Sequence, residues 1–397
     1  MTLHRSRLPA GVWMMGVVSL LMDTSSELIH SLLPLFLVGV LGASTLAVGI
    51  IEGIAESTAM ITKVVSGYAS DRWRRRKPLV VAGYGLAALT KPLFALATSL
   101  GWIVTARFVD RVGKGIRGAP RDALLADITP PERRGAAYGL RQALDNVGAL
   151  LGPLLAIGAM LWLADNFRAA FWIAVIPAVA AVALLVVGVD EPEQVGDGKT
   201  TAVSITLRDV VLLPFAYWWV VGIAAAMTLA RFSEAFLVLR AQSVGMAVAW
   251  IPLVMVAMSA VYALVSYPAG ALADRGCQRA LLSGGLGALI VADVILANAS
   301  SAAMVLIGAA VWGIHMGLTQ GVLAALVAQA APAELRGTAF GLFNLTSGVL
   351  LLVASVLAGW LWAAYGPMAT FYAGTVFTLA AWAAMLLMPG GRQSRAL

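Results

Sequence analysis

The chain has 397 residues, of which 60% are hydrophobic and only 12% are charged. Soluble proteins are about 45–50% apolar and about 25% charged, so this chain has too few ionised groups to cover a water-exposed surface. The composition excludes an ordinary soluble enzyme and a disordered chain. It also excludes a disulfide-rich secreted scaffold, because Cys277 is the single cysteine. The net charge of +7 fits the basic loops of a membrane protein, and we expect no nucleic-acid partner.

Apolar runs predict an all-α membrane protein, because a spanning helix needs about 20 mostly apolar residues and lipid offers the backbone no hydrogen-bond partner. The twelve predicted helices cover residues 11–40, 46–70, 78–98, 101–124, 136–163, 168–189, 210–238, 246–272, 279–298, 302–328, 338–363 and 367–388. The first run is too long for a signal peptide and has no small-residue cleavage site, so we expect it to remain in the mature protein.

Basic residues gather in the loops on one side of the predicted helices. These residues are Arg5, Arg7, Arg72, Arg74, Arg75, Arg76, Lys77, Arg133, Arg134, Lys199, Arg208, Arg275, Arg279, Arg336, Arg392 and Arg395. The loops on the other side are short and hold only Arg168 and Arg240. Since basic loops stay in the cytoplasm, we expect a multi-pass protein of the cytoplasmic (inner) membrane with both termini inside and the lipid bilayer around it.

The two halves of the chain repeat each other. A polar stretch at 190–209 predicts a cytoplasmic linker between a six-helix half at 1–189 and another at 210–397. The motif Gly-x-x-x-Asp-Arg at residues 67–72 recurs at 270–275, and the stretch 132–139 recurs at 334–341, both at a shift of 202–203 residues. Two loop motifs duplicated at one offset indicate an internal repeat.

Three motifs resemble the major facilitator superfamily (MFS) of transporters. The repeated loop, formed by Gly67, Asp71, Arg72 and, in the second half, Gly270, Asp274, Arg275, is similar to the signature loop after helix two, although Arg74 replaces its second glycine. Helix four carries Arg107-x-x-Asp110-Arg111-x-Gly113, a variant of the family pattern, and the stretch 110–122 looks like a prokaryotic subgroup called permeases. The resemblance implies two six-helix halves that rock around a site near the midplane.

A third motif lies in helix five. Gly139, Gly148, Gly152 and Pro153 resemble the family's antiporter motif, with Ala156 and Ile157 replacing its last two glycines. Small residues allow close helix packing in lipid, and proline bends a helix. Antiport is implied by the resemblance alone.

The repeated loops have two interpretations. In the family, contacts of the Asp-Arg loop are thought to latch the outward-facing state, which favours a latch role for Asp71 and Arg72. The alternative is a basic loop that sets orientation only, which we favour for residues 74–77.

Ionisable groups at membrane depth are costly, so each needs a partner or a task. Asp23, Glu27 and His30 are spaced i, i+4, i+7 on one helical face. A carboxylate that alternates between dry and arginine-rich surroundings changes its proton affinity, so Glu27 or Asp23 is the predicted proton carrier. Glu56 and Glu234 are second choices. The alternative is a static salt bridge, for example with Arg111 or Lys114.

The family architecture lines a central cavity with helices one, four, seven and ten. It thereby implies a set of substrate-contacting candidates, namely Asp110, Arg111, Lys114, Arg231 and His315. Seven acids and eight bases lie within the first-half helices. Because internal pairing could absorb nearly all of them, the arginines alone do not establish an anionic substrate.

The sequence gives little support for metal binding and none for direct use of ATP. His30, the helix-one acids and a histidine of a facing helix could bind a divalent metal, but a hydrogen-bonded histidine in a polar interior is the more common arrangement. We therefore predict no resident metal and no cofactor. No G-x-x-x-x-G-K-[ST] sequence is present, so ATP is not the direct energy source.

The sequence thus predicts a monomeric secondary active transporter that exports a small molecule in exchange for protons. The alternatives are proton-coupled uptake of an organic anion and export of a divalent metal or metal chelate. A membrane enzyme is disfavoured because no nucleophile or metal triad is apparent, and a transport-dead sensor because no extra soluble domain is expected. The substrate is left open, since a fold does not determine function.

Overall fold

The computed structural model describes residues 8–73, 75–191, 212–332 and 335–386. Within these ranges the chain is helical apart from short turns, and no strand occurs. The predicted all-α fold is therefore confirmed. The expected linker at 190–209 falls almost entirely outside the described residues.

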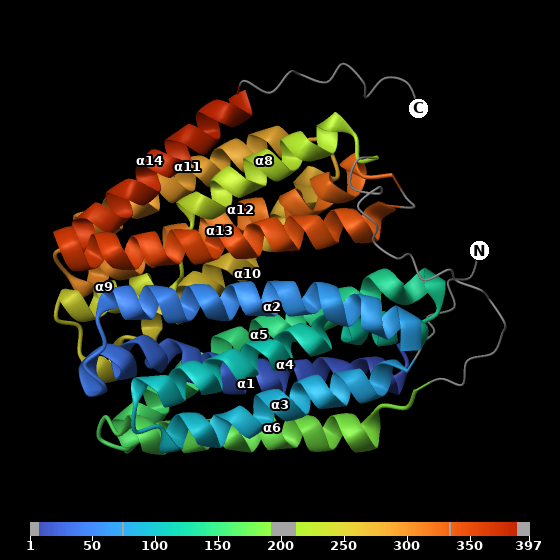
Figure 1. Ribbon diagram of the computed structural model, residues 1–397, viewed down its shortest axis with the longest axis horizontal. Coiled ribbons are helices and arrows are strands. Elements are labelled where there is room, and N and C mark those ends of the chain that lie inside the picture. The colour runs from blue at the N-terminus through green and yellow to red at the C-terminus, as the bar shows by residue number, and fades with distance from the viewer. Residues whose placement is uncertain (1–7, 74, 192–211, 333–334, 387–397) are drawn as a thin grey trace.

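Six helices, which we call the N half, occupy the lower part of Figure 1, and the remaining helices form the C half, which lies above them except for α9, beside the left end of α2. The N half comprises α1 (Ala10–Leu35, extended by a π-helical turn at Phe36–Val40), α2 (Thr45–Trp73), α3 (Arg76–Leu96), α4 (Leu100–Asp127), α5 (Arg134–Trp162) and α6 (Phe167–Gly188). The C half comprises α8 (Phe215–Ala230), α9 (Ala235–Ser243), α10 (Leu253–Ala273), α11 (Gln278–Ala297), α12 (Ala302–Ala330), α13 (Arg336–Tyr365) and α14 (Pro367–Leu386).

The observed spans reproduce eleven of the twelve predicted runs to within four residues, with the 3-10 turn Val248–Trp250 counted as the start of the α10 span. Among the described residues, eleven spans are long and apolar enough to cross a membrane, with α8 and α9 counted as one. The span that fails this criterion is α4, a 28-residue helix. It carries seven charged residues between Arg107 and Asp122. Its charges therefore need partners inside the protein.

The seventh predicted helix, 210–238, needs correction. The structure divides it into α8 and α9, which begin and end five residues later and are separated by a non-helical stretch at 231–234. α8 starts directly after Pro214, which tolerates a helix start because its missing N–H is not needed there. In the break, the Ser233 N–H donates to Ser355 Oγ (3.2 Å) and the Ala235 N–H donates to Ser233 Oγ (3.3 Å). Side-chain oxygens thus satisfy backbone groups that the helix releases.

The halves meet mainly along α2 and α13, and glycines make this contact close. A Cβ atom on Gly49 would lie 2.2 Å from the carbonyl oxygen of Ser355, and one on Gly359 would lie 2.6 Å from that of Thr45. Such backbone proximity between membrane helices requires small residues. Gly53 repeats the contact one turn further along α2, against Leu352.

The two ends of the molecule differ in how the halves pack. At the end away from the chain termini, which we call the joined end, one hydrophobic core includes Phe36 and Phe171 of the N half and Phe232 and Trp312 of the C half. At the termini end, on the right in Figure 1, the described core clusters each belong to a single half. The halves therefore share a core only toward the joined end.

The two basic residues at the joined end have structural partners. Arg168 donates to the Ala97 carbonyl (3.1 Å) just after α3. Arg240 donates to the carbonyls of Leu296 (2.8 Å) and Ala299 (2.7 Å) at the end of α11. A cation at a helix carboxyl terminus satisfies free carbonyls and complements the helix dipole. Both arginines thus cap helices.

Candidate functional site

Helix α4 brings charged side chains to the middle of the N half. A Cβ atom on Gly113 would lie 2.7 Å from the carbonyl oxygen of Gly83 in α3, and one on Gly115 would lie 2.8 Å from that of Ala59 in α2. Because these glycines let α2 and α3 approach α4 closely, polar side chains of all three helices fall within ion-pair distance.

A chain of four polar side chains, which we call the Glu27–Arg107 chain, links α1, α2 and α4. Arg107 Nη2 donates to Glu52 Oε2 at 2.6 Å, and the same oxygen lies 3.4 Å from His30 Nε2. His30 Nδ1 lies 3.2 Å from Glu27 Oε2. The Arg107 end is buried, whereas the Glu27 side chain is 22% exposed. His30 thus lies between two acids, and Glu52 is the member that helix-face spacing could not reveal.

The predicted substrate residues Asp110 and Arg111 are buried and already paired. Lys91 Nζ donates to Asp110 Oδ1 at 2.7 Å. Arg111 Nη1 lies 3.1 Å from Glu56 Oε1. A buried ion needs such a partner to offset the loss of hydration. Substrate contact by these two residues stays a prediction.

Toward the termini end, a second set of ion pairs joins α1, α4 and α5. Asp23 Oδ1 lies 3.7 Å from Arg117 Nη2, and the Arg117 guanidinium lies 4.6 Å from the Tyr84 ring centroid. The static partners expected for Asp23 and Glu27 were Arg111 or Lys114. The structure gives Arg117 and His30 instead, because Arg111 is held by Glu56.

The remaining acids of this region share two arginines. Arg121 Nε lies 3.3 Å from Asp122 Oδ1, and Arg141 Nη1 donates to Asp145 Oδ2 at 2.5 Å. Cross-contacts of 3.7 Å (Arg141 to Asp122) and 4.0 Å (Arg121 to Asp145) connect the two pairs. The four side chains form one network between α4 and α5.

The helix-five glycines pack directly behind the predicted proton carriers. A Cβ atom on Gly148 would lie 3.0 Å from the Cβ of Asp23, and one on Gly152 would lie 2.7 Å from the Cβ of Glu27. Pro153 is also buried in α5. Gly139 has no neighbour within 4 Å of the corresponding position. Two of the three motif glycines thus set the position of α1 and of its acids.

The C half contributes polar groups near the break between α8 and α9. Arg231 and Glu234 are half-buried there, and Glu234 lies within electrostatic range of His30 and Glu27 of the other half. His315 in α12 is buried, with Nδ1 2.9 Å from the Gly285 carbonyl oxygen. Glu234 therefore lies close enough to act electrostatically on the Glu27–Arg107 chain, while His315 bonds within its own half.

A buried acid outside this region has no polar partner. Asp293 in α11 is fully buried, and neither carboxylate oxygen has a hydrogen-bond partner among the described residues. Its Oδ2 would lie 2.6 Å from a Cβ atom on Gly374 in α14. The carboxyl group thus fits against a glycine rather than against a cation.

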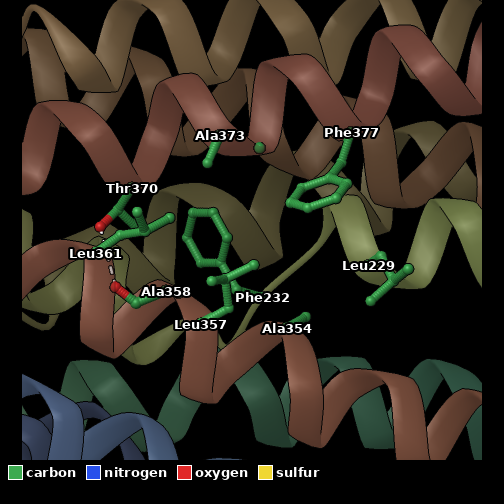
Figure 2. Close-up of a pocket in the computed structure, with 10 residues that line it drawn as sticks. Leu229, Phe232, Ala354, Leu357, Ala358, Leu361, Thr370, Ala373 and Phe377 are labelled. Atoms are coloured by element: carbon green, nitrogen blue, oxygen red, sulfur yellow. Dashed lines mark hydrogen bonds between the residues drawn. The ribbon is translucent and has the colours of Figure 1, made fainter.

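A small apolar pocket lies beside Gly374, between α8, α13 and α14. Figure 2 shows Phe232 and Phe377 at its walls and the hydrogen bond from Thr370 Oγ1 to the Ala358 carbonyl (3.1 Å). Its volume of about 10 Å³ is room for about one water, whereas ligand pockets occupy about 300–1,000 Å³. This pocket is a packing gap and does not accommodate a substrate.

The repeated loop motifs lie at the termini end. Gly67 packs near Ala119, since a Cβ on Gly67 would lie 3.3 Å from that of Ala119, whereas Gly270 has open space. The Asp71 side chain lies outside the described part of the structure. The remaining motif side chains, Arg72, Asp274 and Arg275, are exposed and form no ion pair with any described residue. A latch role for these loops stays a prediction.

An acid that the sequence analysis did not single out does cap a helix here. Glu191, just after α6, accepts hydrogen bonds from the backbone N–H groups of Arg76 and Lys77 (3.2 Å for Lys77) at the start of α3. Arg76 Nη1 also lies 2.6 Å from Asp127 Oδ2 at the end of α4. A carboxylate at a helix amino terminus is stabilising. No local pattern reveals this contact, because 115 residues separate its partners.

Metal binding finds no support within the described ranges. There, no three side chains of His, Cys, Asp or Glu are grouped so that they could hold a metal ion.

The long apolar helices, the repeated halves and the ionised groups buried inside them define a multi-pass membrane protein. The sequence profile of the Major Facilitator Superfamily matches residues 15–252 and 226–396. The chain belongs to this superfamily and is a transporter rather than an enzyme.

Individual relatives agree with this assignment. An MFS-type transporter of Methanocaldococcus jannaschii is 32% identical over 381 residues, which cover 94% of this chain and 93% of the relative. The inner membrane transport protein YajR of Escherichia coli is 24% identical, over 92% of this chain and 80% of that protein.

Solved structures show the same fold. A bacterial homologue of the human lysosomal transporter Spinster matches with a TM-score of 0.77 at 15% identity, over 95% of both chains. The nucleoside transporter NupG also matches with a TM-score of 0.77, at 12% identity, over 94% of this chain and 98% of that chain.

Proposed function

We propose that this protein is a proton-coupled exporter of a small molecule, working by alternating access as a monomer in the cytoplasmic membrane. The observation that carries the proposal is the Glu27–Arg107 chain. It runs from a partly exposed carboxylate on α1 to a buried ion pair between α2 and α4. Its exposed end lies within electrostatic range of Glu234 in the opposite half.

The Glu27–Arg107 chain suggests how a proton is exchanged. Glu27 faces His30 on its own helix, Arg111 and Lys114 on α4, and Glu234 in the break between α8 and α9. If the halves rock apart, the distance between Glu27 and Glu234 changes, while the bond from Glu27 to His30 stays within α1. A carboxylate whose charged neighbours change in this way changes its proton affinity. Glu27 is the proposed carrier, and His30 holds it in position.

The orientation rests on the loops. Among the described residues, bases such as Arg72, Arg75, Arg133, Arg275 and Arg279 lie in the connections or at the adjoining helix ends at the termini end. The two bases at the joined end, Arg168 and Arg240, cap helices. The positive-inside rule then places both termini in the cytoplasm. Export rather than uptake is supported by the resemblance of the α5 motif to that of antiporters.

The test uses purified protein in proteoliposomes that contain a pH-sensitive dye. A panel of anions, cations and neutral solutes is first screened for compounds that raise the thermal unfolding temperature, since ligands stabilise the folded state. These compounds are then added to the proteoliposomes with and without an imposed pH gradient. We expect wild-type protein to exchange such a compound for protons. Glu27→Gln should lose the dependence on the gradient, whereas Glu132→Gln, at an exposed position near the termini end, should keep it.

Two results decide against parts of the proposal. If Glu27→Gln responds to the proton gradient like wild-type protein, Glu27 is not the carrier. If the compound and protons move in the same direction, the protein is a symporter and the export assignment is wrong.

A further inference from the structure

Each acid at membrane depth in the N half can be matched with a basic partner of its own. Each of seven acids at membrane depth has a basic partner within 4.0 Å: Glu27 with His30, Glu52 with Arg107, Glu56 with Arg111, Asp110 with Lys91, Asp23 with Arg117, Asp122 with Arg121, and Asp145 with Arg141. This matching uses every acid and leaves two bases over. They are Lys63 on α2 and Lys114 on α4, neither of which forms an ion pair with a described residue.

Both lysines are exposed, although Lys63 lies well inside the α2 span and Lys114 lies at the middle of α4. Lys114 is one turn beyond Arg111 and acts electrostatically on Asp23, Glu27 and Glu56. Its surroundings are thus the polar face of α1 and α2 rather than lipid.

Lys63 reaches the same face of α4. A Cβ atom on Gly118 would lie 3.4–3.5 Å from Cγ, Cδ and Cε of Lys63. Gly118 follows Lys114 by four residues, so the two positions lie one above the other on the helix. Lys63 also acts electrostatically on the charged groups of α4 and α5, including Asp122 and Lys114. Two unpaired ammonium groups therefore share one surface of α4.

Two like charges at membrane depth without counter-ions are costly, and the paired acids nearby are already used. Since lysine presents a compact ammonium group on a flexible stem, the two side chains can converge on one ligand. We propose that Lys63 and Lys114 together bind a dianionic group of the substrate, of the phosphate-monoester or dicarboxylate class. This inference rests on the proposed transport pathway between the halves and specifies the charge of what is carried.

The two lysines are well suited to a mutational test. Lys63→Gln and Lys114→Gln remove a surplus charge and leave every acid with its partner, so we expect both variants to fold. The assay is thermal unfolding of the purified full-length protein in neutral detergent. The probes are inorganic phosphate, succinate and phosphatidic acid, compared with sodium chloride at equal ionic strength.

We expect at least one probe to raise the unfolding temperature of wild-type protein in a dose-dependent way, because binding stabilises the folded state. Each single variant should weaken the apparent affinity by about tenfold, the typical loss for one charge-assisted hydrogen bond, and the double variant should abolish the effect. Arg75→Gln removes a positive charge from an exposed loop position and should leave the affinity unchanged. A response to phosphatidic acid alone would assign the dianionic group to a lipid, and a response to phosphate or succinate would assign it to a soluble solute.

The proposal is overturned if no probe stabilises wild-type protein beyond sodium chloride, or if the double variant responds like wild type. Glu27→Gln separates it from the proposed proton coupling. Anion binding that persists in Glu27→Gln supports the lysine site whatever the result of the proton-exchange assay.

Discussion

The N half and the C half have the same six-span plan but bury different chemistry. In the N half, α4 holds Arg107, Asp110 and Arg111, each paired with an acid or base of a neighbouring helix. In the described C half, the corresponding depth is filled by aromatic rings such as Phe232, Trp312 and Phe371. The duplication therefore preserved the backbone arrangement and not the ionised interior. The proposed proton and substrate chemistry is best sought in the N half.

The largest effect should follow from breaking a buried pair of the N half. Arg107→Met leaves Glu52 buried without its closest cation, so the free energy of unfolding should fall by about 3–5 kcal/mol. Unfolding in mixed micelles with increasing denaturing detergent measures this. The double variant Arg107→Met/Glu52→Leu should recover most of the loss, because no buried charge is then left unpaired. A single variant as stable as wild type would show that this pair does not support the N half.

An intermediate effect is expected where α5 packs against α1. Gly152→Ala places a Cβ within 2.7 Å of the Glu27 Cβ and the Thr24 carbonyl oxygen, and overpacking of this kind costs about 1–3 kcal/mol. Gly139→Ala is the matched control in the same helix. Because Gly139 has open space around it, Gly139→Ala should change the free energy of unfolding by no more than about 1 kcal/mol, in the direction that favours the helix. Equal destabilisation by both would contradict the close packing of α1 on α5.

Asp293, the buried acid of the C half without a described partner, should differ from the paired acids in how removal of its charge changes the stability. Asp293→Asn removes a carboxyl group that has no described partner, so stability should be unchanged or higher by up to about 1 kcal/mol. Asp110→Asn leaves Lys91 buried without its counter-ion and should be clearly destabilising. Thermal unfolding of both variants provides the comparison. A marked loss for Asp293→Asn would indicate a polar partner for Asp293 in another conformation.

The smallest effect is expected in the C-half loop motif. Asp274 is exposed and forms no ion pair among the described residues, so Asp274→Asn should change the free energy of unfolding by less than about 0.5 kcal/mol. The same denaturation assay checks this. A transport defect in this variant with unchanged stability would favour the latch role for the repeated loop.

Prediction from sequence worked where the signal was local. Apolar run length gave the spans because the bilayer sets a minimum helix length, and the spacing of Asp23, Glu27 and His30 placed them on one face because α-helical geometry is regular. The break at 231–234 was missed because the apolar runs at 220–230 and 235–239 read as one span across Arg231 and Glu234. It is stabilised by Ser355, which lies 122 residues further along the chain.

The sequence by itself determined the membrane-spanning fold, the repeated halves and the set of buried charges, because composition and helical periodicity depend on near neighbours. Only the tertiary structure decided which charge pairs with which. Glu52 meets His30 and Arg107, Arg111 is held by Glu56 and is unavailable to Glu27, and Lys63 and Lys114 are left over. The physical reason is that ion pairing at membrane depth depends on distances of a few ångströms between different helices. Those distances are set by glycine contacts such as Gly113 and Gly152, whose partners are distant in the chain.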